Sequence, residues 1–178
     1  MGRRSDLQEF AKLAVESFDD VLLDRGFQRI SRKIERNSFR VDYRSGVRYV
    51  SIRASTDPRD DPPCFSVLLG EGSLDWPEAD WNAIALWRLR NFLAHSDEAA
   101  AYVLGEAPVG ALIERATAEL LEYGADFLAG DTKSFRQARS IQNKDRQPYR
   151  IHEPDGRGGY RTRIDPESAK IKERFSQE

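Results

Sequence analysis

The residues best suited to chemistry are basic side chains that alternate with apolar ones between positions 39 and 53. Alternate residues of a β-strand face opposite sides of a sheet, so this spacing predicts one apolar face and one basic face. The apolar face would carry Val41, Tyr43, Val50 and Ile52, and the exposed face would carry Arg40, Arg44, Tyr49 and Arg53 together with Ser51. Such a face is suited to binding anions.

Three interpretations of this basic face stay open. Arginines beside an aromatic ring on an open sheet can hold single-stranded nucleic acid, through phosphate contacts and base stacking. The same residues could dock on an acidic surface of another protein. They could also be ordinary surface residues that pair across strands. The sequence pI of about 5.8 counts against nucleic acid, because domains that bind it are usually basic.

The sequence contains no recognisable catalytic or metal-binding motif. The chain has one Cys and two His. We expect Cys64 to be a small buried hydrophobe and His95 to serve a helix end, whereas His152 lies in a segment without the preorganisation that a metal needs. Asp57, Asp60 and Asp61 are expected in a solvated, proline-rich loop. We therefore expect no metal and no cofactor, and the balance favours a protein that is not an enzyme.

Charge is sorted along the chain in blocks. Residues 25–53 carry nine Arg or Lys against two acids, residues 54–130 carry four against fourteen, and residues 131–178 carry twelve against eight. The net charge of −2 conceals this pattern. Segregated charge bears on partners and on self-association rather than on catalysis.

Hydrophobic periodicity predicts the elements that would position the basic face. A helix is expected over about 5–25, ending at Gly26. A meander of three or four antiparallel strands should follow over 27–70, with Ile30 and Ile34 of the first strand in the core. Helices are then expected from about Pro77 to Leu93, from Ser96 to Gly105, from Pro108 to Gly130 and from about 132 to Lys144. The fold class is α+β, with a C-terminal helical layer.

The last part of the chain has a different composition. Residues 1–144 are expected to form one globular domain, and 145–178 a basic, polar tail with few aliphatic side chains. The tail would be either a disordered extension or a strap on acidic helices of its own or a neighbouring subunit, with a short helix over 168–175. Its candidate partner-binding residues are Tyr149, Arg157, Tyr160, Arg161 and Arg163.

The order of these segments resembles small bacterial immunity-like proteins of unknown function that occur near toxin or defence genes. The segments that carry the resemblance are Gly26-Phe27, Phe39-Arg40-Val41-Asp42-Tyr43, Tyr49-Val50-Ser51-Ile52 and Phe65-Ser66-Val67-Leu68-Leu69-Gly70. The resemblance covers about residues 5–130 and implies no catalytic residues.

These observations favour a non-catalytic protein-binding module that docks through charge-complementary surfaces, with an immunity or defence-system component as its specific form. A nucleic-acid-associated protein is the alternative. The partner would be an acidic protein surface, or a second copy through the tail. No apolar run approaches the ~18 residues of a membrane span, and Met1-Gly2-Arg3-Arg4 does not begin a secretory signal. We therefore expect a cytoplasmic protein.

Overall fold

A computed structural model describes residues 3–57, 64–98, 102–156 and 158–175, with side chains from residue 7 onward. It confirms the α+β class. The elements are α1 (Arg3–Leu22), the 3₁₀ turn η1 (Leu23–Arg25), β1 (Gln28–Ile34), β2 (Ser38–Ser45), β3 (Arg48–Ser55), β4 (Cys64–Glu71), α2 (Glu78–Asn82), β5 (Ala83–Ala85), α3 (Leu86–Ala94), β6 (Tyr102–Val103), α4 (Val109–Tyr123), α5 (Ala125–Ala129), α6 (Lys133–Asn143), β7 (Arg150–Pro154), β8 (Tyr160–Ile164) and α7 (Pro166–Phe175).

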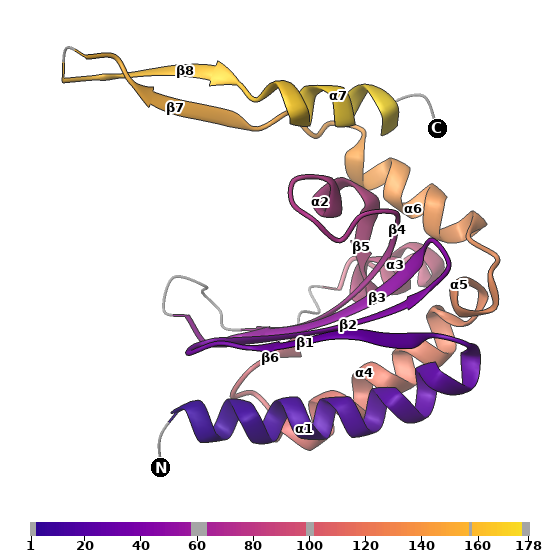
Figure 1. Cartoon of the computed structure of the whole chain (residues 1–178). Helices are drawn as coiled ribbons and strands as arrows, with labels where there is room; N and C mark the ends of the chain where they lie inside the picture. Colours follow the sequence, from indigo (N-terminus) through magenta and orange to yellow (C-terminus); the bar gives the residue numbers. More distant parts are fainter. Residues whose placement is uncertain (1–2, 58–63, 99–101, 157, 176–178) are drawn as a thin grey trace.

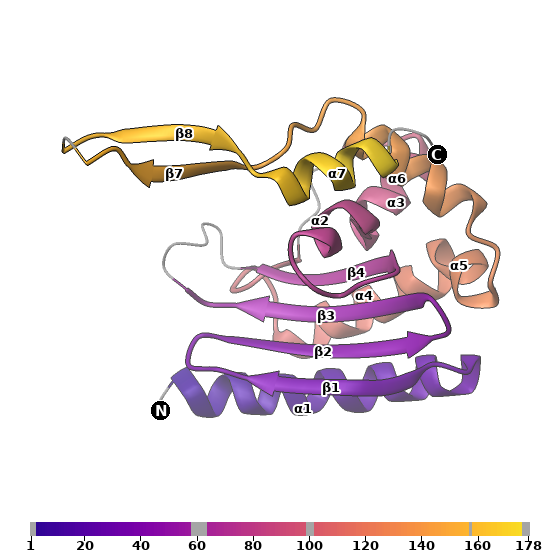
Figure 2. The ribbon, with the colours of Figure 1, turned by 45° about the horizontal axis from the view of Figure 1, so that its top comes forward.

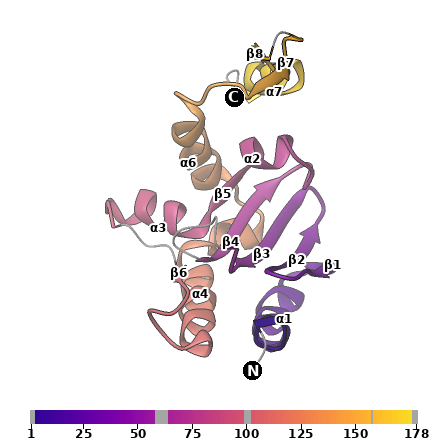
Figure 3. The same ribbon diagram turned by 90° about the vertical axis from the view of Figure 1, so that its left-hand side faces the viewer.

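Antiparallel strands form the centre of the molecule. Figure 2 shows β1 to β4 side by side; β5 follows β4 in the sheet, and β6 also pairs with β4 (Figure 1). Helices α1 and α4 lie against one face of this sheet, whereas α7 lies on the opposite side (Figures 1 and 3). The apolar face of the predicted alternation is confirmed, because Val41, Val50 and Ile52 are at most 1% exposed on the helix-covered side. On the other face, the predicted exposure of Ser51 is wrong, since it is fully buried. Burial of this apolar face drives the layer arrangement.

Strand β1 shows how a local irregularity changes which residues face the core. Ile34 packs against the core as expected, but the prediction for Ile30 is wrong, since its side chain is 49% exposed. The register with β2 shifts between Arg29 and Ser31. One extra residue at such a β-bulge reverses the side to which alternate residues point. After the bulge, Ser31 and Lys33 belong to the face opposite the core.

Two of the expected helices are wrong in part. The helix expected from Pro77 to Leu93 is interrupted by β5, which pairs with β4. The helix expected over 96–105 is not seen at Tyr102 and Val103, which pair with β4 as β6; residues 99–101 lie outside the described part. At both places, pairing with the edge of β4 satisfies backbone groups and outweighs helix propensity.

The tail carries regular structure. Strands β7 and β8 form a hairpin, here called the arm (residues 150–164), which projects away from the globule (Figure 1). Helix α7 instead docks on the globule: Ile171 is 7% exposed, and the Arg174 guanidinium lies 2.8 Å from the carboxylate of Glu78 in α2. In the described part of the tail, the arm therefore leaves the globule and α7 docks on it.

Candidate functional site

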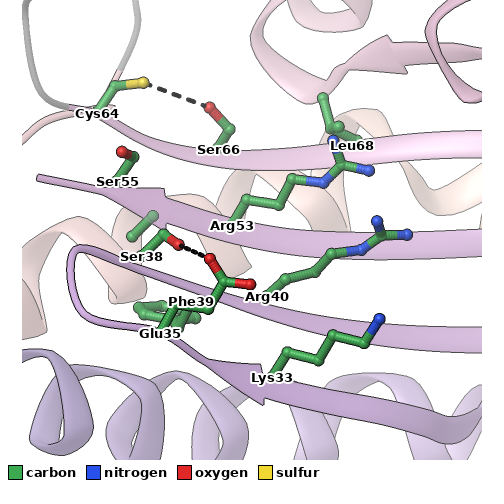
Figure 4. Close-up of a pocket in the computed structure, with 11 residues that line it drawn as sticks. Lys33, Glu35, Ser38, Phe39, Arg40, Arg53, Ser55, Cys64, Ser66 and Leu68 are labelled. Atoms are coloured by element: carbon green, nitrogen blue, oxygen red, sulfur yellow. Dashed lines mark hydrogen bonds between the residues drawn. The ribbon is translucent and has the colours of Figure 1, made fainter. Parts of the chain in front are cut away.

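The sheet face opposite α1 and α4 is polar, and we call it the open face. The pairing register places Lys33 of β1 opposite Arg40 of β2, Arg40 opposite Arg53 of β3, and Arg53 opposite Ser66 of β4. The three cations form a row across adjacent strands, called the cationic row, and their long side chains run in the same direction (Figure 4). Like charges directly opposite each other on neighbouring strands are destabilising.

Asp42 balances one of these charges. Its carboxylate accepts hydrogen bonds from Arg40 Nε at 2.8 Å and from the Ser31 hydroxyl at 2.6 Å. Burial on its own raises the pKa of Asp42, but these hydrogen bonds and the Arg40 charge outweigh it and hold the pKa below its usual range. Asp42 is therefore a buried, ionised carboxylate that fixes the position of Arg40.

Arg53 has no such partner. Its Nε donates to the Ser51 hydroxyl at 2.9 Å, and among the described residues no carboxylate oxygen lies within 4.0 Å of its guanidinium. Burial, followed by the positive charge of Arg40, lowers the pKa of Arg53. A half-buried guanidinium whose terminal nitrogens have no acceptor in the described part of the protein is ready to bind an anion.

A cavity of about 540 Å³ adjoins the row (Figure 4). It is lined by side chains from β1 to β4, including Ser66 and Cys64, and Glu35 stands at its border near the Ser38 hydroxyl (3.4 Å). Cys64 is half-buried in this lining, so the prediction of a buried hydrophobe is wrong. Its sulfur lies 3.9 Å from the Ser66 hydroxyl, and the lining residues include no histidine.

Arg44 and Tyr49 lie on the open face as predicted, but they bind their own chain. Arg44 donates to the Gly72 carbonyl at 2.9 Å. Tyr49 is fully buried, which contradicts its predicted exposure, and its hydroxyl donates to Asn82 Oδ1 at 2.5 Å. The ring packs directly over Gly70, where an added Cβ would lie 2.2 Å from it. The segment that follows β4 folds back over this end of the sheet and removes Tyr49 as a stacking surface.

The candidate residues of the tail do not join the cationic row in a single cluster. Tyr149 donates to Asp80 Oδ2 at 2.5 Å, and burial and this hydrogen bond raise its pKa to about 12. Arg161 and Arg163 both pair with Glu153 inside the arm, and Tyr160 is 73% exposed. Arg157 lies outside the described residues. Tyr149 is therefore a structural link between the tail and α2, and the arm is a separate surface.

The sequence interpretation missed Lys33 and Ser66. Their residue types were visible, but their place beside Arg40 and Arg53 depends on strand register. The bulge in β1 obscures the register of Lys33, and the pairing of β3 with β4 places Ser66. Elsewhere, His95 ends α3 in a left-handed conformation, with φ 51°, and His152 Nδ1 lies 2.9 Å from the Thr162 hydroxyl. Within the described part of the chain, no three His, Cys, Asp or Glu side chains gather as metal ligands.

Comparison with known proteins returned no match to this chain among protein-family models, curated proteins or solved structures. None of the described helices is both long enough and apolar enough to cross a membrane.

Proposed function

We propose that this chain is a non-catalytic protein-binding module that receives an acidic segment of another protein on its open face. The observation that carries the proposal is the cationic row, in which Lys33, Arg40 and Arg53 stand in register on adjacent strands. The row costs free energy through repulsion in the unbound protein. Carboxylates of a partner would relieve that repulsion.

The free donors of the row match a carboxylate ligand. The terminal nitrogens of Arg53 donate no hydrogen bond to the described residues, and a guanidinium can bind both oxygens of a carboxylate. Arg40 is oriented by Asp42 and by a bond from its Nη2 to the Leu74 carbonyl at 3.2 Å. Fixed geometry of this kind lowers the entropy lost on binding.

A protein partner accounts for the site better than nucleic acid does. Non-specific binding of single strands usually combines phosphate contacts with an exposed aromatic platform, and Tyr49 is buried. Glu35 and Asp42 also place negative charge beside the row, which opposes a polyanion with evenly spaced phosphates. Nucleic acid is retained as an outcome of the test below.

The test measures fluorescence anisotropy of two labelled probes, a ten-residue peptide of alternating Glu and Gly and a single-stranded decanucleotide. We expect the peptide to bind more tightly at about 150 mM salt, where phosphate-driven binding is weak. Arg53→Gln should weaken peptide binding by about tenfold, because it removes charged hydrogen bonds. Arg32→Gln is the matched control, since Arg32 pairs with Val41 on the opposite face of the same sheet.

Two results would contradict the proposal. Tighter binding of the decanucleotide, with the same dependence on Arg53, would assign the open face to nucleic acid. Equal peptide affinity for Arg53→Gln and Arg32→Gln would place any acidic partner elsewhere on the surface.

The specific form of the proposal is a cytoplasmic immunity or defence-system component of a bacterium. It is suggested by the order of segments in the sequence of residues 5–130 and by the cationic row on the open face. The corresponding test is co-expression with the product of a neighbouring toxin gene. Protection of the cells by the natural chain, and its loss in Arg53→Gln, is the expected result; protection that survives the substitution would separate this role from the open face.

A further inference from the structure

The free donors on the open face outnumber the acceptors that a single carboxylate offers. Lys33 has no hydrogen-bond or ion-pair partner among the described residues. Within the described part of the chain, the terminal nitrogens of Arg53 likewise donate no hydrogen bond, and the Ser66 side chain has one such contact, to the Cys64 sulfur at 3.9 Å. Nη1 of Arg40 adds another donor beside them. These groups come from four adjacent strands and border one cavity (Figure 4).

We propose that the cationic row binds a phosphorylated side chain of the acidic partner segment. This inference rests on the proposed function and names the group that the site recognises. A phosphate monoester presents three strong acceptor oxygens and a charge of about −2 near neutral pH. Lys33 and Arg53 can approach such a tetrahedral group from different sides, and Ser66 adds a hydroxyl on the strand next to Arg53, whereas one guanidinium already satisfies a planar carboxylate.

The electrostatics of the row favour a dianion over a monoanion. Asp42 is engaged with Arg40 and Ser31, and among the described residues neither Lys33 nor Arg53 forms an ion pair or a hydrogen bond with a carboxylate. Arg53 is half-buried in the cavity lining, so its guanidinium has lost part of its hydration. A ligand that carries two charges restores more of the lost stabilisation than a ligand with one.

The extent of the site indicates a phosphorylated segment rather than a free phosphate ester. The lining reaches from Lys33 on β1 to Leu68 on β4. Three steps between neighbouring strands, at about 4.8 Å each, make about 14 Å. This width exceeds a phosphate group and leaves space for the residues on either side of a modified side chain.

The experiment compares three labelled ten-residue peptides built from Glu and Gly. One carries a central serine, the second carries phosphoserine at that position, and the third carries two consecutive Glu residues there to match the added charge. Affinity is measured by anisotropy at about 150 mM salt, with competition by inorganic phosphate and phenyl phosphate. The proteins are the natural chain, Arg53→Gln, Lys33→Gln, Ser66→Ala and the control Arg32→Gln.

We expect the phosphoserine peptide to bind at least about tenfold more tightly than the charge-matched peptide. Arg53→Gln and Lys33→Gln should abolish that preference, Ser66→Ala should reduce it, and Arg32→Gln should keep it. Equal binding of the phosphorylated and charge-matched peptides would overturn this inference and leave the proposed function standing. Phenyl phosphate that competes with an affinity equal to that of the phosphopeptide would also overturn it, by assigning the site to a small phosphate ester. Failure of all three peptides to bind would remove the proposed function itself.

Discussion

Tyr49 joins the sheet to the segment that covers one end of the open face, and replacing it tests this arrangement. The substitution Tyr49→Phe keeps the ring over Gly70 and removes the hydroxyl that donates to Asn82. Asn82 would keep its bond from Nδ2 to the Ser73 carbonyl, but its Oδ1 would lose the Tyr49 donor. Both side chains are fully buried, so water does not readily replace the missing hydroxyl.

The magnitude follows from these partners. Loss of a buried hydrogen bond that leaves an acceptor without a donor costs about 1–3 kcal/mol. For a domain of this size, each kcal/mol corresponds to about 2–4 °C in the unfolding midpoint. We therefore expect Tyr49→Phe to lower the free energy of unfolding by about 2 kcal/mol and the midpoint by about 4–8 °C.

The assay is urea unfolding followed by far-UV circular dichroism, with thermal unfolding as a second measurement. Tyr160→Phe is the matched control, because Tyr160 is 73% exposed in the arm, and it should leave both values unchanged. A double-mutant cycle with Asn82→Ala should give a coupling free energy of at least about 0.5 kcal/mol. A loss below about 0.5 kcal/mol for Tyr49→Phe, with no coupling, would refute the buried hydrogen bond as the link between the two segments.

Three further outcomes are expected. Arg48→Met should lower the free energy of unfolding by about 1.5–3 kcal/mol. Arg48 Nη1 donates to the carbonyls of Phe127 and Leu128 at the end of α5, and its Cζ lies 5.3 Å from the centre of the Phe27 ring. An unchanged urea midpoint would contradict this. Replacing residues 150–164 by a short Gly-rich turn should change the free energy of unfolding by less than about 1 kcal/mol, because a backbone hydrogen bond of 2.8 Å already joins Tyr149 and Asp165. Truncation after Lys144 should instead lower the thermal midpoint, because it removes Tyr149 and α7. Equal effects of the two deletions would show that the arm stabilises the globule. Asp42→Asn should destabilise the protein at pH 7, and the difference should shrink as the pH falls toward about 3. The reason is that a folded pKa below the unfolded value of about 3.9 gives stability that is present above that value and lost as Asp42 is protonated in the folded state. A difference that is constant from pH 7 to pH 3 would show that ionisation of Asp42 contributes nothing.

Local patterns were enough for the order of the main elements. Helix α1 and the η1 turn after it end at Gly26, whose φ of 76° suits a glycine, and the alternation of β2 and β3 separates an apolar face from a polar one. These features depend on residues that are near in sequence, and helix and strand periods make them visible. The same alternation placed Arg40 and Arg53 together on the face opposite the core.

Contacts between distant residues decided the rest. Strands β5 and β6 form because the edge of β4 offers backbone partners to residues 83–85 and 102–103, and no local period records that edge. Tyr49 is buried because Asn82, 33 positions later in the chain, folds over it. Both contacts join residues far apart in the sequence, so a local sequence pattern does not predict them.

The amino-acid sequence thus determined a basic strand face, its charge and its apolar reverse side. Tertiary structure decided which members of that face stay free to bind. Register across β1 to β4 brings Lys33 and Ser66 beside Arg53, while the 72–82 segment engages Arg44 and Tyr49. Alternation fixes the side to which a residue points, but the availability of its donors depends on which distant acceptors the fold brings within hydrogen-bond distance.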